Sequence, residues 1–153
     1  MEPTIVADAC IIVKWFIPEP YSQQAATLRD DHLTGKIKVI APKTAITEFA
    51  NTIRKYVVRG LITREDAFKA LKLLQAVEVQ YIDIEGELLA KALNYSLENH
   101  VTIYDACYIA LAHQHKTTMY TADEKLLKQL KNKDPIVKHI QEYPKDRKQL
   151  LKH

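Results

Sequence analysis

Short β-branched and apolar runs alternate with longer segments of helical periodicity along almost the whole chain. Strands are predicted at Thr4 to Ala7, Ile37 to Ile40, Val79 to Ile84 and Thr118 to Thr121, with Ile136 to Ile140 as a last edge strand. Between these runs, apolar residues recur at spacings of three and four, which predicts helices. Strands that alternate with helices indicate an α/β sandwich with a mainly parallel sheet.

The predicted helices fill the intervals between the strands. Gly60 provides a stop for the second long helix, and Thr63 with Asp66 has the spacing of a capping box that starts the next one. After an apolar segment from Ala9 to Phe16, the helices are expected at Tyr21 to His32, Thr44 to Arg59, Thr63 to Val77, Glu85 to Asn99, Thr102 to His115 and Asp123 to Leu130.

The expected domain organisation follows from the length of the chain and from the absence of a linker or repeat within it. The chain of 153 residues has the size of one domain and contains no repeat, low-complexity tract or linker. We therefore expect a single domain over residues 1–142, followed by a basic C-terminal tail over residues 143–153. Within that tail, Lys145 to His153 is expected to be loosely held.

Several functional classes are disfavoured by composition. The three glycines form neither a GxGxxG motif nor a P-loop, which argues against nucleotide cofactors. Cys10 and Cys107 form no CxxC pair, so buried thiols are favoured over a zinc site. No apolar run approaches the ~20 residues of a membrane span, and the N-terminus lacks signal-peptide features. We therefore expect a cytoplasmic protein that does not associate with a membrane. The net charge of +3 permits a polyanionic partner.

Four carboxylates lie where a predicted strand gives way to a helix, or in the first turns of one. They are Asp8, Glu48, Asp105 and Asp123. Strand-to-helix junctions of an open parallel sheet share one edge, where such sheets bind ligands. Carboxylates gathered there repel one another unless a hard cation such as Mg²⁺ or Mn²⁺ neutralises them. The set therefore predicts a metal-dependent hydrolase that acts on phosphates.

Each acid also has a simpler interpretation. Asp8 suits a helix N-cap, and a phosphotransferase of the haloacid dehalogenase type would need a second Asp where Cys10 stands. Glu48 lies opposite the apolar stripe of its helix, which is typical of a solvated face. Asp105 fits a capping box with Thr102.

Asp123 is left without such a role, because Thr121 and Glu124 form the corresponding capping box at that helix start. A chemical function for Asp123 is therefore favoured. No single acid decides the matter, and the hypothesis depends on the whole set.

With these acids in this order, the chain resembles the PIN-domain nucleases, and most of all the VapC-type toxins of toxin–antitoxin pairs. The resemblance runs from about Thr4 to Ile140. It is carried by Thr47 to Asn51, by the stretch Tyr104 to Ala112 and by the stretch Tyr120 to Leu126. It implies a three-layer α/β/α sandwich that cuts RNA with Mg²⁺ or Mn²⁺.

The resemblance also implies roles for particular residues. Asp8, Asp105 and Asp123 would bind the metal, Glu48 would complete the catalytic set, and Thr121 would support it. The family often has Ser or Asn where this chain has Cys10, and a thiol is a poor ligand for Mg²⁺. Besides Thr121, Tyr104 is a candidate to hydrogen-bond the carboxylates or the substrate.

Partners follow from the same resemblance. It implies an RNA substrate, an antitoxin that covers the acidic cleft, and a homodimer formed through the helices Thr44–Arg59 and Thr63–Val77. Five basic residues lie near the predicted site in sequence, and each reads more simply as a solvated charge than as an RNA contact: Lys14, Arg54, Lys55, Lys125 and Lys128. The alternatives are a PIN nuclease that is not a toxin, a non-catalytic module that docks RNA or protein, and a phosphatase for small substrates.

Overall fold

A parallel five-stranded sheet forms the centre of the computed structural model, which describes residues 2–151. The strand order is β3-β2-β1-β4-β5, and every neighbouring pair is parallel. The first strand therefore lies in the middle, and the chain adds strands outward on both sides. The strands are β1 (Thr4–Ala7), β2 (Lys38–Pro42), β3 (Gln80–Ile82), β4 (Met119–Thr121) and β5 (Val137–His139).

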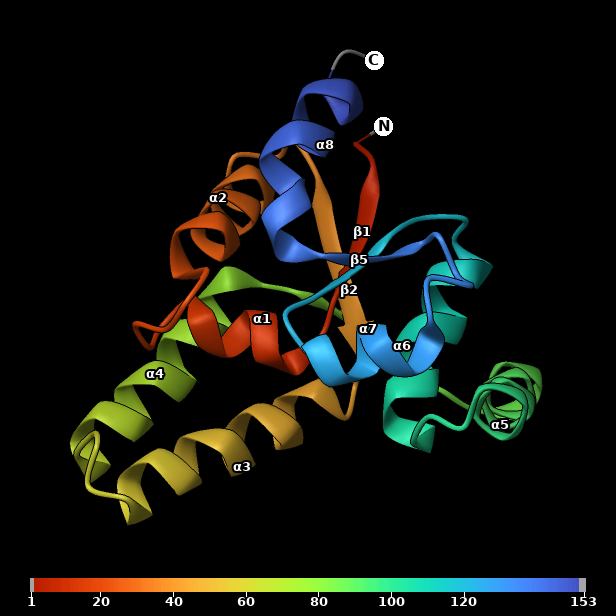
Figure 1. The fold of residues 1–153 in the computed structure, drawn as a ribbon. Coiled ribbons are helices and arrows are strands. Elements are labelled where there is room, and N and C mark those ends of the chain that lie inside the picture. The colour runs from red at the N-terminus through yellow and green to blue at the C-terminus, as the bar shows by residue number, and fades with distance from the viewer. Residues whose placement is uncertain (1, 152–153) are drawn as a thin grey trace.

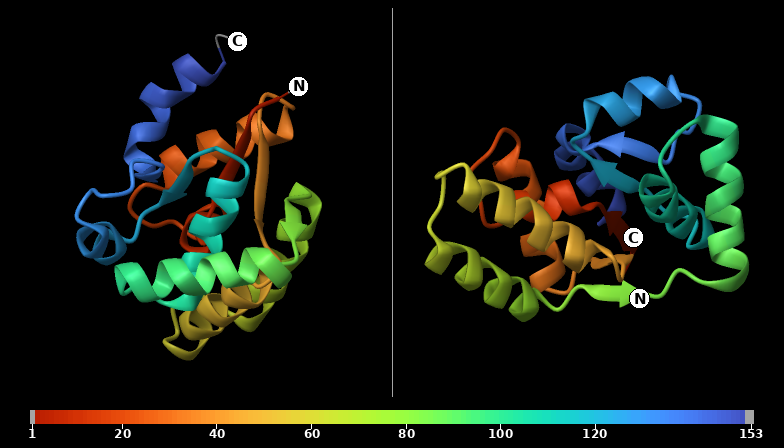
Figure 2. Two further views of the ribbon diagram at one scale, coloured as in Figure 1. Left: turned by 90° about the vertical axis from the view of Figure 1, so that its right-hand side faces the viewer. Right: turned by 90° about the horizontal axis from the view of Figure 1, so that it is seen from below.

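Helices cover both faces of this sheet (Figures 1 and 2). Helices α1 and α2 pack together on one face, with α3 and α4 extending that layer, whereas α5 and α6 pair on the other. This arrangement confirms the predicted three-layer sandwich. The helices are α1 (Ala9–Lys14), α2 (Ser22–Leu33), α3 (Ala45–Val58), α4 (Arg64–Val77), α5 (Gly86–Asn99), α6 (Ile103–Gln114), α7 (Glu124–Leu130) and α8 (Tyr143–Leu150).

Local sequence signals set several of these boundaries. Helix α4 begins at a reciprocal capping box, in which Thr63 accepts from the Asp66 backbone and Asp66 accepts from the Thr63 backbone. Helix α3 ends at Val58, and Gly60 follows with a φ of +74°, which only glycine adopts without strain. Both predicted signals are therefore confirmed.

The core lies on both faces of the central strand. Ile5, Val6 and Ala7 of β1 are fully buried, as expected for a parallel strand with helices above and below it. Helix α6 supplies much of the opposing layer, because its run from Ala106 to Ala112 is apolar on nearly every side. The sheet edge at the carboxyl ends of β1 and β4 is thus held by a rigid centre.

The expectation of a loosely held tail is wrong for the part of it that the structure describes. Tyr143 is fully buried and begins α8, which packs against α2. Asp31 of α2 accepts a 2.6 Å hydrogen bond from the Tyr143 hydroxyl and a 2.8 Å bond from Arg147 Nε. Composition suggested a solvated basic tail, but these contacts depend on a carboxylate more than a hundred residues away. Residues 152 and 153 lie outside the described part.

Over residues 2–151, the structure contains no helix with the length and apolar character of a membrane span.

Candidate active site

A polar cavity of about 300 Å³ opens where β1 and β4 end, between α1, α3 and α6. All four predicted acids line it. We call it the acid pocket, and its lining consists of Asp8, Ala9, Cys10, Val13, Lys14, Glu19, Glu48, Thr52, Asp105, Tyr108 and Asp123. The topology explains why these acids lie in one cavity. Strands β1 and β4 are adjacent and parallel, so the residues that follow them reach the same edge of the sheet.

Asp8 forms the floor of the pocket. It follows β1 directly, is buried, and caps α1 by accepting a 3.1 Å bond from the Ile11 backbone on Oδ1. The same oxygen accepts a 2.8 Å bond from Cys10 Sγ. Burial raises the pKa of Asp8 to about 6, an effect that Asp105 reinforces and the hydrogen bonds oppose. Asp8 is therefore both an N-cap and an acid whose ionised form is disfavoured by burial.

Cys10 links the two central strands. Besides its bond to Asp8, its sulfur accepts from the Ala122 backbone at 3.4 Å and lies 3.7 Å from Thr121 Oγ1. Burial and the neighbouring Asp8 raise the pKa of the Cys10 thiol, so it stays protonated and can donate to that carboxylate. The thiol thus supplies the donor that Ser would supply at this position.

Glu48 faces the pocket from α3. The Tyr108 hydroxyl of α6 donates a hydrogen bond to its Oε2. The pKa of Glu48 is raised by burial and by repulsion from Asp105, while the Tyr108 bond opposes the shift. Periodicity placed Glu48 on a solvated face, and the structure places it half-buried, on the wall of a cavity.

Asp105 approaches from the first turn of α6, on the same side as Tyr108 one turn later. Thr102 caps the helix by accepting a 3.1 Å bond from the Asp105 backbone, but no bond returns from the Asp105 carboxylate to the Thr102 backbone. The capping box is therefore only half formed. Burial raises the pKa of Asp105, and repulsion from Asp123 adds to the effect.

Asp123 is itself the N-cap of α7 and accepts a 3.1 Å bond from the Leu126 backbone on Oδ1. The sequence pattern had given the capping role to Thr121. Instead, the buried Thr121 hydroxyl accepts a 3.0 Å bond from the Asp123 backbone and fixes the turn between β4 and α7. Asp123 is exposed at the mouth of the pocket.

The four acids line one cavity, but their carboxylates are not clustered closely enough to form a ready-made metal site. Within residues 2–151, no group of three His, Cys, Asp or Glu side chains is close enough to hold a metal ion as arranged. The raised pKa values of Asp8, Glu48 and Asp105 show mutual repulsion and desolvation instead. An acid cluster of this kind is stabilised when a cation binds or when the acids are protonated.

Other predicted residues lie elsewhere. Tyr104 is 60% exposed and does not line the acid pocket, whereas Tyr108 does. Trp15 is a core residue, as its apolar neighbours predict, and its Nε1 donates to the Ala25 carbonyl. Arg54 lines a separate groove between α3 and α4.

Sequence reasoning did not find Glu19 or its partner Tyr56, and it interpreted Lys14 as a solvated charge. Glu19 is a fifth carboxylate on the lining, and Lys14 forms a 3.2 Å ion pair with it. The Tyr56 hydroxyl of α3 donates to the same carboxylate. The Pro18 and Pro20 that flank Glu19 mark a rigid loop, but no local pattern shows that the loop faces the acids.

Known proteins resemble this chain in sequence and in fold. The family profile described as the PIN domain matches residues 5–133. Ribonuclease VapC3 of Pyrobaculum aerophilum is 29% identical over 123 residues, covering 80% of this chain and 91% of that protein.

Two crystal structures are also similar. PAE2754 from Pyrobaculum aerophilum has a TM-score of 0.66 at 20% identity and covers 92% of this chain and 93% of its own. VapC20 of Mycobacterium tuberculosis, a toxin that cleaves the sarcin-ricin loop, has a TM-score of 0.58 at 14% identity and covers 80% and 92%. Since the profile spans most of the sequence and the parallel sandwich agrees with it, this chain belongs to the PIN domain family.

Proposed function

We propose that this protein is a metal-dependent endoribonuclease that hydrolyses RNA phosphodiesters in the acid pocket. The observation that carries the proposal is the convergence of Asp8, Glu48, Asp105 and Asp123 on one cavity at the carboxyl edge of the sheet. The name of the relative Ribonuclease VapC3 supports a nuclease.

The side chains of the pocket suit a hard divalent cation. Carboxylate oxygens are the preferred ligands of Mg²⁺ and Mn²⁺. Asp8 and Asp123 each use Oδ1 for a backbone bond, and Glu48 uses Oε2 for Tyr108. These bonds orient the carboxylates, and each carboxylate keeps a second oxygen that could bind an ion. In our proposal, Asp8, Asp105 and Asp123 hold the metal, and Glu48 completes the set.

When bound, Mg²⁺ or Mn²⁺ neutralises charge on the phosphoryl oxygens and lowers the pKa of a water molecule. The residues of the chain position this chemistry. Cys10 and Ile11 fix Asp8, and Thr121 fixes the turn that carries Asp123. Glu48, held by Tyr108, orients the attacking water at the wall of the cavity. Tyr104 is exposed on α6 and does not line the acid pocket, so in our proposal it contacts the substrate outside the pocket.

We further propose that the nuclease is the toxin of a toxin–antitoxin pair and acts in the cytoplasm. VapC20 is a toxin by its description, and it shares the fold. A cognate antitoxin would cover the acid pocket and keep RNA out. Growth arrest on expression of the wild type, absent with Asp105→Asn, would mark a toxin, whereas unimpaired growth despite cleavage in vitro would mark a nuclease of RNA processing.

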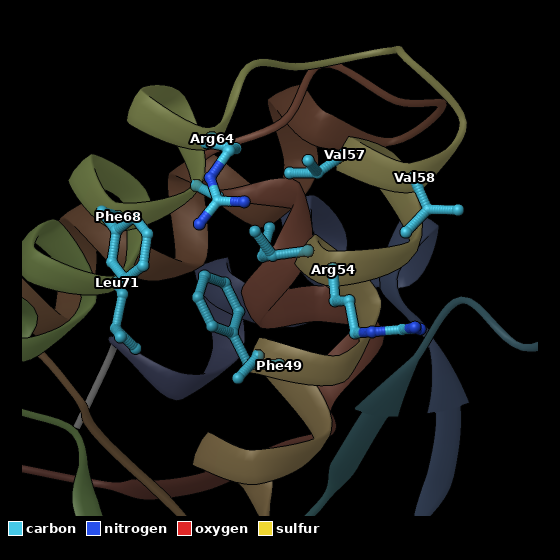
Figure 3. Close-up of a pocket in the computed structure, with 10 residues that line it drawn as sticks. Phe49, Arg54, Val57, Val58, Arg64, Phe68 and Leu71 are labelled. Atoms are coloured by element: carbon cyan, nitrogen blue, oxygen red, sulfur yellow. The ribbon is translucent and has the colours of Figure 1, made fainter.

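A homodimer would use an apolar groove of about 360 Å³ between α3 and α4, which we call the α3–α4 groove (Figure 3). Phe49 of α3 is fully buried at the groove, and Phe68 and Leu71 line it from α4, with 68% of Phe68 exposed. Val58 and Leu61 extend the exposed apolar surface at the connection between the helices. Burial of this surface against a second copy removes it from water.

The first test is cleavage of a labelled single-stranded RNA with Mg²⁺, Mn²⁺ or EDTA. We expect cleavage with either metal and none with EDTA. Asp8→Asn and Asp105→Asn should cleave at least ~100-fold more slowly, because losing a metal ligand costs more activity than the 10–100-fold lost when a residue that only supports a ligand is changed. Asp83→Asn is the matched control, since its carboxylate is exposed and pairs with Lys43 outside the pocket. Equal cleavage by all variants would refute the proposed site.

A further inference from the structure

Lys14 is the one basic residue on the described lining of the acid pocket. Only 10% of its side chain is exposed, so it is not the solvated charge that its sequence position suggests. It lies one turn after Cys10 on α1, which places both on the same side of the helix. A lysine whose side chain is nearly buried therefore lines a cavity whose other charged residues are carboxylates.

Glu19 and Tyr56 fix the position of this ammonium group. Lys14 Nζ donates to Glu19 Oε1 at 3.2 Å, and the Tyr56 hydroxyl donates to Glu19 Oε2, so both oxygens of Glu19 have a partner. The backbone of Glu19 is tied to Ser22 in both directions, through a 2.9 Å bond to Ser22 Oγ and a 3.1 Å bond from Ser22 N. Glu19 is thus preorganised as a support for Lys14.

The ammonium group has unused donors. Its bond to Glu19 is the one hydrogen bond of Lys14 Nζ within residues 2–151, and an ammonium group has three N–H donors. Two donors of Lys14 therefore remain for a ligand.

An RNA phosphate is the ligand that matches these donors. A phosphodiester that enters a pocket of five carboxylates is repelled unless cations are present, and phosphate contacts by Lys or Arg supply much of the affinity for nucleic acids. A metal held by the acids neutralises the scissile group. Lys14 stands beside that set, at the Glu19 end of the same cavity.

We propose that Lys14 binds a backbone phosphate of the RNA in the acid pocket, and that Glu19 and Tyr56 are positioning residues that hold its ammonium group. The inference rests on the proposed nuclease function and names a substrate contact within it. It predicts that Lys14 contributes more to substrate binding than to the chemical step.

The test compares Lys14→Met with the wild type in steady-state cleavage of a single-stranded RNA. We expect KM to rise roughly tenfold or more, as for loss of a charged hydrogen bond, with a smaller change in kcat. The dependence of log KM on log salt should become shallower by about 0.7. Lys14→Arg should restore part of the affinity. Lys72→Met, which removes an exposed lysine of α4 outside the pocket, is the matched control.

A purely structural ion pair gives a different result. Lys14→Met leaves Glu19 without its cation, and the double variant Lys14→Met with Glu19→Gln removes that charge as well. If the double variant regains thermal stability but keeps the high KM, Lys14 contacts the substrate. If it regains the wild-type KM and salt dependence, Lys14 only balances Glu19 and the inference is wrong.

A binding measurement that needs no cleavage separates failure of the proposed nuclease function from failure of the Lys14 contact. Fluorescence anisotropy of labelled RNA is measured with Asp105→Asn and with Asp105→Asn plus Lys14→Met. Weaker binding with a shallower salt dependence in the second protein supports the Lys14 contact even if the wild type cuts no RNA. Identical binding by both proteins refutes the contact even if the wild type is an active nuclease.

Discussion

Two demands meet in the single side chain of Asp8. As an N-cap it accepts the Ile11 backbone bond that starts α1, and as a buried acid beside Asp105 it resists ionisation. A neutral amide of the same shape would satisfy the cap without the charge. The native carboxylate is therefore understandable as a ligand that is stabilised only when a cation is present.

We predict that Asp8→Asn stabilises the metal-free protein near pH 7.5. The pKa of Asp8 is raised from 3.8 to about 6, so the folded state binds more protons than the unfolded state between these values and loses stability as the pH rises through them. The shift corresponds to about 3 kcal/mol at most above that range and to roughly 0.5 kcal/mol near pH 4. Thermal unfolding with EDTA at both pH values measures the difference.

Metal provides the control for this prediction. If the acid pocket holds a metal as proposed, Mn²⁺ should raise the Tm of the wild type, whereas Asp8→Asn should respond much less. A gain in stability of the same size at both pH values would show that the effect is not the ionisation of Asp8.

The other acids show how far local patterns can be trusted at single residues. Asp105 and Thr102 had the spacing of a capping box, yet the carboxylate takes no part in it. Asp123 seemed free of capping and is the N-cap of α7. In both cases the pattern located the helix start correctly, but the choice of oxygen depended on neighbours outside the segment.

At the scale of elements, α8 differs most from expectation. Its sequence is polar and basic, and its attachment depends on Asp31 of α2, which is 4% exposed and accepts bonds from Tyr143 and Arg147. Tyr120 of β4 also donates to Asp146, so α8 is joined to the sheet as well. Over residues 143–151, the C-terminal segment is therefore packed against α2 and β4.

We predict that Arg147→Met destabilises the protein by about 2 kcal/mol, because a buried carboxylate loses its charged partner. Urea unfolding measures the loss. Lys148→Met, next along α8 and exposed, should change stability little. Pairing Arg147→Met with Asp31→Asn should recover part of the loss. If a chain truncated after Glu142 unfolds at the wild-type urea concentration, the docking of α8 contributes nothing.

At the scale of the whole molecule, the α3–α4 groove exposes apolar side chains, with Phe68 68% exposed. We predict that the protein is a dimer of twice 17.6 kDa and that Phe68→Glu gives a folded monomer. A charge in an apolar interface opposes association, but Phe68 is exposed in the single chain, so the fold should tolerate the change. Light scattering after size exclusion measures both masses.

Lys72→Glu is the matched control, since it introduces the same acid on α4 at an exposed position outside the groove. It should leave the mass at the dimer value. A mass of 17.6 kDa for the wild type would contradict the predicted homodimer.

The sequence by itself determined the layers, the parallel sheet and the boundaries of most helices other than α8, because each depends on periodicity, caps and turns within a few residues. It also placed the acids at one sheet edge, since parallel strands share that edge. Only the tertiary structure decided that Glu48 meets Tyr108, 60 residues away, that Lys14 turns into the acid pocket, and that α8 docks on Asp31. Periodicity reports which side of an element is apolar, whereas the partner of a polar side chain is set by elements that pack against it from elsewhere in the chain.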